Sequence, residues 1–149
     1  RSENEVVVVV KPWSDEKRPV LKEQYRKAIE DYIEPYRLIN TKVTVESARY
    51  AGICVHGKIA LDQDSPKTRK AVLERISREL SYTERKHPFG TVISYGQLFT
   101  ALENTEGVKK VLELNLERTG NAARKNDRGD VLLDADALGI LEGTDLEFC

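Results

Sequence analysis

A run of β-branched residues near the start of the chain constrains the fold more than any other feature. Glu5–Val10 reads EVVVVV and ends at Lys11-Pro12. Valine is stiff at its first side-chain torsion and packs well on a pleated surface, which favours a strand. Because the apolar residues are consecutive rather than alternating, we expect this strand to be buried on both faces.

An amphipathic helix is predicted to follow, over residues 20–34, and Pro35 helps to end it. Its apolar residues recur at helical spacing: Leu21, Tyr25, Ala28, Ile29, Tyr32, Ile33 and Tyr36. The preferred interpretation of the three tyrosines is packing in the core. The alternative is contact with another chain, because a tyrosine ring buries apolar area while its hydroxyl stays hydrogen-bonded.

Alternating and helical patterns then repeat. Residues 41–46 and 53–61 alternate, which predicts two strands, or one long bent strand, with a break near 47–52. Ser65-Pro66 is typical of a helix start, with a capping hydroxyl before a proline in the first turn. The predicted helix spans 66–82, and its inner face is assigned to Val72, Leu73, Ile76 and Leu80.

The last third of the chain is predicted to form a short helix, several strands and turns. Ser94 and Gln97 have the spacing of a capping box, which starts a third helix. Residues 108–117 form a strand with Leu112, Leu114 and Leu116 on one face. We expect residues 118–129 to be a long flexible hairpin loop, and 130–133 and 139–148 to be short strands.

These elements predict an α+β fold of two small mixed layers, with three helices, repeated strand-helix-strand units and a hairpin-rich C-terminus. We place a β-α-β subdomain at 1–49 and an α+β subdomain at 50–149. The chain begins with Arg and has no Met, so we expect it to be a fragment of a longer protein.

Charge and hydropathy limit the class of partner. The 24 basic and 25 acidic residues give a formal net charge of -1, so neither nucleic acid nor an anionic membrane is expected as a partner. The longest apolar run, Val6–Val10, is far shorter than the roughly 18 residues of a membrane span. Cys54 and Cys149 belong to no CxxC motif, which favours a reducing compartment and leaves a disulfide unsupported.

No pattern typical of an active site is found. Cys54 and His56 would share one strand face as half of a metal site, but no second pair has zinc-type spacing. Asp62 and Asp64 precede a helix, where negatively charged carboxylates interact favourably with the positive end of the helix dipole. Asp134 and Asp136 fit a turn. No phosphate-binding glycine motif is present. We therefore predict no catalytic, cofactor-binding or metal-binding residue.

Basic residues gather in the segment predicted to be a loop: Arg118, Arg124, Lys125 and Arg128. Such a segment suits an acidic protein surface, or a polyanion. From the residues alone, the candidate interface therefore comprises Tyr25, Tyr32, Tyr36, Arg124 and Arg128.

Four segments, taken in order, carry a resemblance to a known family. They are EPYRLINTKVTV at 34–45, PFGTVISYGQL at 88–98, EGVKKV at 106–111 and DALGIL at 136–141. Gly90 and Gly107 suit tight turns where a Cβ would clash. Together the segments resemble the C-terminal part of the baseplate J-like proteins of contractile phage tails.

The resemblance implies a structural subunit, not an enzyme, in the tail baseplate of a phage, a prophage or a related injection system. Its partners would be copies of itself and other baseplate subunits, joined by protein–protein contacts, with no small-molecule substrate and no cofactor. It would be assembled in the bacterial cytoplasm and function in the virion tail baseplate.

Two other classes of function stay open. One is a small metal-dependent hydrolase or nuclease that uses Asp62, Asp64, His56 and His87. His87 lies in a Lys-His-Pro segment without an evident nucleophile. The other is a ligand-binding α+β domain, for which the repeated strand-helix-strand unit is the motivating feature.

Overall fold

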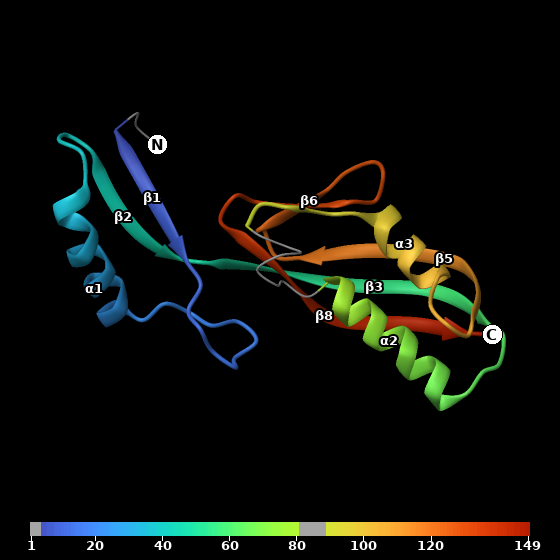
Figure 1. Ribbon diagram of the computed structural model, residues 1–149. Coiled ribbons are helices and arrows are strands. Elements are labelled where there is room, and N and C mark those ends of the chain that lie inside the picture. Colours follow the sequence, from blue (N-terminus) through green and yellow to red (C-terminus); the bar gives the residue numbers. More distant parts are fainter. Residues whose placement is uncertain (1–3, 81–88) are drawn as a thin grey trace. The chain divides into compact units, whose positions relative to one another are not determined.

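The computed structural model describes residues 4–80 and 89–149, and it confirms a mixed α+β fold (Figure 1). Its elements in chain order are β1 (Glu5–Val10), α1 (Glu23–Ile33), the 3-10 helix η1 (Glu34–Tyr36), β2 (Lys42–Ser47), β3 (Arg49–Leu61), α2 (Pro66–Leu80), β4 (Val92–Ile93), α3 (Tyr95–Glu103), β5 (Val108–Thr119), β6 (Ala123–Lys125), β7 (Val131–Leu133) and β8 (Ala137–Phe148). Contacts divide the chain into unit 1, Arg1–Arg49, and unit 2, Tyr50–Cys149.

In its described residues, unit 1 is a two-stranded parallel sheet with one α-helix, followed by the 3-10 helix η1. β1 pairs with β2 in a register that runs from Glu5 opposite Lys42 to Val10 opposite Ser47. α1 packs against β2. The helix begins later than predicted, at Glu23, because the preceding Lys22 has an extended backbone and no side chain caps the first turn.

The expectation that β1 is fully buried is wrong. Its residues are half-buried, and Val6 is 49% exposed. In the described part of unit 1, the apolar residues of the core reduce to Val45 and Ala48, and α1 contributes none. Two strands and one helix are too few to cover a valine-rich strand on both sides, so unit 1 leaves much of its apolar surface in contact with solvent.

Unit 2 is organised around β3, the central strand of a sheet with the order β5-β3-β8. β3 pairs antiparallel with β5, from Gly52 opposite Thr119 to Leu61 opposite Val108. Beside β8, the N–H of Cys149 donates to Ile59 and the N–H of Leu61 donates to Cys149, which is the spacing of a parallel pair. A smaller sheet has the order β4-β7-β6, and both of its pairs are antiparallel.

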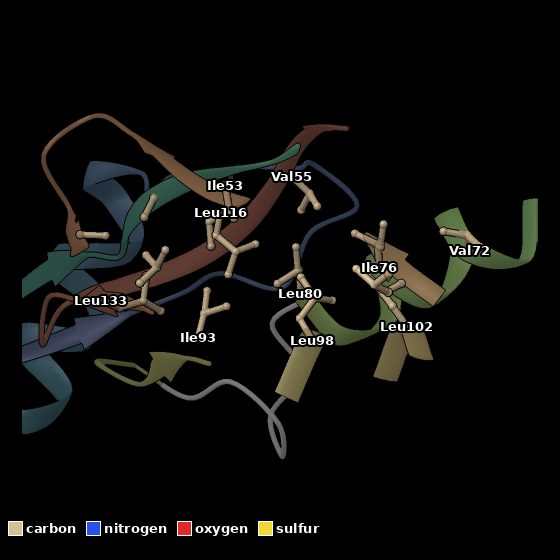
Figure 2. Packing of buried hydrophobic residues seen from close by; sticks show 14 of the residues in the cluster. Ile53, Val55, Val72, Ile76, Leu80, Ile93, Leu98, Leu102, Leu116 and Leu133 are labelled. Atoms are coloured by element: carbon tan, nitrogen blue, oxygen red, sulfur yellow. The ribbon is translucent and has the colours of Figure 1, made fainter. Parts of the chain in front are cut away.

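The core of unit 2 lies between these strands and two helices. α2 and α3 pack against each other, α3 also packs against β5, and α2 against β8. Figure 2 shows Ile76 and Leu80 of α2 and Leu98 and Leu102 of α3 gathered near Val55 of the sheet. The capping predictions are confirmed, because Ser65 accepts from the N–H of Thr68 and Ser94 from that of Gln97.

Two leucines assigned to inner faces are exposed, which corrects the prediction. Leu73 lies outside the buried stripe of α2, which consists of Val72, Ile76 and Leu80. Leu112 is exposed because the register steps from Lys58 opposite Glu113 to Ile59 opposite Val111, so Leu112 is the extra residue of a β-bulge. The bulge turns Val111 inward in its place.

The long flexible loop predicted over 118–129 is also wrong. β5 continues to Thr119, and β6 follows as a strand paired with β7. Ala122 and Ala123 are buried there. The predicted tight turns are confirmed at two glycines, because Gly90 and Gly107 have φ values of 69° and 89°. A Cβ on Gly107 would also lie 2.6 Å from Cγ2 of Thr68.

Two substitutions on α2 test this packing. Ile76→Ala removes a fully buried side chain and should lower the free energy of unfolding by roughly 2–5 kcal/mol. Leu73→Ala changes an exposed side chain of the same helix and should cost under about 1 kcal/mol. Urea denaturation followed by circular dichroism measures both, and equal losses would contradict the assignment of the buried face.

Candidate interaction surface

The three tyrosines predicted to pack in the core are exposed, which corrects the preferred interpretation. Tyr25, Tyr32 and Tyr36 are 57%, 74% and 75% exposed. On the same helix, Ile29 and Ile33 are half-buried. The rings of Tyr32 and Tyr36 are 6.0 Å apart at a tilt of 43°. The three tyrosines belong to the surface of unit 1.

Exposed apolar side chains are concentrated in unit 1. Of the twelve large exposed apolar side chains among the described residues, eight belong to this smaller unit. They are Val6, Trp13, Val20, Tyr25, Tyr32, Tyr36, Leu38 and Ile39, with Trp13 95% and Ile39 90% exposed. Exposed apolar groups gathered in one region mark interaction surfaces more often than single ones do. Sequence reasoning singled out the tyrosines but missed Trp13, Leu38 and Ile39.

The two arginines of the candidate interface lie in unit 2 and are exposed. Arg124 belongs to β6, and Arg128 lies in the turn between β6 and β7, where its N–H donates to Oδ1 of Asn126. The neighbouring Lys125 is held by Glu117 and Asn115, at 3.0 and 2.7 Å from its Nζ. The tyrosines and arginines belong to different units, so we treat them as two surfaces.

The candidate metal ligands do not form a cluster in the parts of the chain that the structure describes. No group there brings together three side chains of His, Cys, Asp or Glu. Asp64 forms two hydrogen bonds of 2.6 Å to Arg69, and Nδ1 of His56 lies 3.7 Å from Oδ2 of Asp145. Cys54 and Cys149 are free thiols. His87 lies outside the described residues.

Ion pairs explain the displaced carboxyl pKa values. The hydrogen bonds and charge of Arg69 hold the pKa of Asp64 below its usual value. Lys125 and Asn115 lower the pKa of Glu117 in the same way. Arg69 also stacks over the ring of Phe148, with its Cζ 5.1 Å from the ring centre. These carboxylates are therefore partners of basic side chains on the surface.

The Asp64–Arg69 pair predicts a measurable pH dependence. A lowered folded-state pKa means that the pair stabilises the fold above the unfolded pKa, and that this stabilisation is lost as pH falls through the folded value. NMR titration should place the pKa of Asp64 below 3.8, and Arg69→Gln should raise it. An unchanged pKa in Arg69→Gln would contradict the assigned cause.

No helix in the described parts of the chain combines the length and the apolar character needed to span a membrane.

Comparison with known proteins identifies a similar fold in a prophage baseplate. No protein-family model matches the chain, and no curated protein matches it. Its structure is similar to a chain in the baseplate of the anti-feeding prophage, solved by cryo-electron microscopy with six-fold symmetry. The TM-score is 0.71 at 15% sequence identity, over 94% of this chain and 30% of that one. The chain thus has the fold of a segment of a prophage baseplate protein.

Proposed function

We propose that this chain is part of a structural subunit of a contractile-tail baseplate, in a phage, a prophage or a related injection system. The observation that carries the proposal is the fold similarity to an anti-feeding prophage baseplate chain over 94% of the length. The four ordered motifs that resemble the baseplate J-like family support it independently, because they rest on residues rather than on backbone shape. Membership of that family is part of the proposal.

The chain corresponds to a region of a longer protein in this proposal. It covers 30% of the similar baseplate chain, which leaves room for further regions in the intact subunit. The intact subunit would be assembled in the bacterial cytoplasm and function at the tail baseplate. Its partners would be copies of itself and other baseplate subunits.

Two surfaces suit such contacts. The apolar surface of unit 1, with Tyr25, Tyr32, Tyr36 and Trp13, has the aromatic side chains that protein interfaces favour. Arg124 and Arg128 on the β6–β7 hairpin would contact acidic groups of a neighbouring subunit. Neither surface needs chemistry beyond burial, hydrogen bonding and charge pairing.

No specific observation favours the hydrolase or ligand-binding alternatives. The hydrolase hypothesis relies on Asp62, Asp64, His56 and His87. The structure pairs Asp64 with Arg69 and places His56 beside Asp145. Partners on the surface therefore account for Asp64 and His56 without a metal.

Labelling of intact particles tests the proposed function. Cells whose genome encodes the chain should yield contractile particles that antibody raised against it labels with gold at the baseplate end in electron micrographs. Particles lacking the gene serve as the control. Label that is absent from the particles, or spread along the sheath, would overturn the proposal, provided that the cells express the chain.

Substitution of the tyrosines tests the unit 1 surface. Combined Tyr25→Ser, Tyr32→Ser and Tyr36→Ser should change the free energy of unfolding by under about 1.5 kcal/mol, because these side chains are exposed. The same variant should enter particles at a reduced level, measured by quantitative mass spectrometry. Leu73→Ser, an exposed apolar position in unit 2, is the matched control. Normal incorporation of the triple variant would rule this surface out.

A further inference from the structure

The outer edge of β1 carries backbone groups that have no partner strand in the described part of unit 1. Lys42 donates its N–H to Asn4 and Ala48 donates its N–H to Val10, which fixes the phase of the parallel ladder. Even-numbered residues of β1 therefore direct their backbone groups toward β2. Val7 and Val9 direct theirs to the opposite side, where β1 has no neighbouring strand in the described residues.

The outer edge of β2, unlike that of β1, is contacted by α1 and by the segment before it. The N–H of Val45, on the side away from β1, donates to Oε1 of Glu30 on α1 at 3.3 Å. The N–H of Leu21, just before that helix, donates to Oγ of Ser47. The helix and its lead-in thus occupy the β2 edge, whereas no described strand pairs with the outer edge of β1.

β1 lacks the features that keep edge strands from pairing. Natural edges are protected by lysines, prolines or bulges within the strand. β1 has five consecutive valines instead, with Glu5 at its start and Lys11-Pro12 beyond its end. A two-stranded sheet is also marginal by itself, and parallel strands are normally covered on both faces. The edge therefore favours addition of a strand.

We propose that β1 pairs antiparallel with β1 of a second copy of this chain. The inference rests on the proposed function, because it names one subunit contact of the assembly. The segment Glu5–Lys11 is complementary to itself when reversed, with opposite charges at its two ends and valines between. In that register Glu5 lies opposite Lys11 of the partner subunit at both ends of the pair. Opposite charges across antiparallel strands stabilise the pairing.

This register also agrees with the directions of the backbone N–H and C=O groups of β1. It places Val7 opposite Val9 of the partner subunit, and these are the residues whose N–H and C=O groups point outward, so they form hydrogen-bonded pairs. Val8 then lies opposite its own copy, on the two-fold axis, as a non-hydrogen-bonded pair. The product is a continuous four-stranded sheet with the order β2-β1-β1-β2, in which the edges of both copies are paired.

Disulfide cross-linking tests the register in a background of Cys54→Ala and Cys149→Ala. Cross-strand Cα atoms of a non-hydrogen-bonded pair lie about 4.5 Å apart, which suits a disulfide. Val8→Cys should therefore oxidise to a covalent dimer by itself. Val6→Cys, on the same strand, should not, but should cross-link when mixed with Val10→Cys. No dimer for Val8→Cys, or equal dimer for Val6→Cys alone, would overturn the proposal.

Charge exchange supplies a test that leaves the valines intact. Light scattering coupled to size exclusion should show a monomer–dimer equilibrium of the 149-residue chain. Glu5→Lys should weaken the dimer by about tenfold, because it replaces two attractive pairs with two repulsive ones. Adding Lys11→Glu should restore it, and circular dichroism checks that each variant is folded.

The possible outcomes separate this inference from the proposed function. A monomer at every concentration, or a dimer insensitive to the charge exchange, would overturn the β1 pairing. Neither result would affect the gold labelling of particles, which tests the baseplate assignment by itself. Label at the baseplate together with a monomeric chain would mean that the subunit uses other contacts.

Discussion

The antiparallel pairing of β3 with β5 is the interaction on which unit 2 depends. It runs from Gly52 to Leu61 of β3, so the inward side chains of the two strands form one continuous apolar surface. Ile53, Val55 and Leu116 on that surface are fully buried, and α2 and α3 add Ile76 and Leu102 above it. The bulges shift the pairing register of β5 against β3, so that the side chain of Val111 points into the core. With this surface covered, unit 2 completes its own core.

In unit 1, by contrast, the apolar side chains of the sheet are not fully covered within the unit. Its valine-rich strand has the composition of a core strand, yet it lies in a two-stranded sheet beside one helix. Its apolar side chains consequently remain on the surface. An assembly subunit can cover such side chains with a neighbouring chain, because association buries the surface that folding leaves exposed. The two-stranded sheet and the exposed aromatic residues both reflect the apolar surface that folding of unit 1 leaves uncovered.

Sequence patterns predicted elements where local signals decide the structure. Ser94 marked the start of α3, and the stripe of Val72, Ile76 and Leu80 marked α2. Prediction failed where long-range pairing decides. Residues 123–125 became a strand because β7 lies beside them, although Ala122 and Ala123 are too small to show an apolar period. The exposed Leu112 depends on a bulge, which no periodicity reveals. The tyrosines were wrongly assigned to the core because a helical stripe indicates an apolar face but does not show which surface covers that face.

Hydrogen exchange at individual valine amides tests most directly the claim that unit 1 completes its sheet with a second copy. Val6, Val8 and Val10 should be protected at all protein concentrations, because β2 binds their N–H groups. Val7 and Val9 should exchange rapidly in dilute solution and slow down as concentration rises and the second β1 adds. Val7 and Val9 amides that exchange at the same rate across the whole concentration range would contradict the pairing of β1 with a second copy.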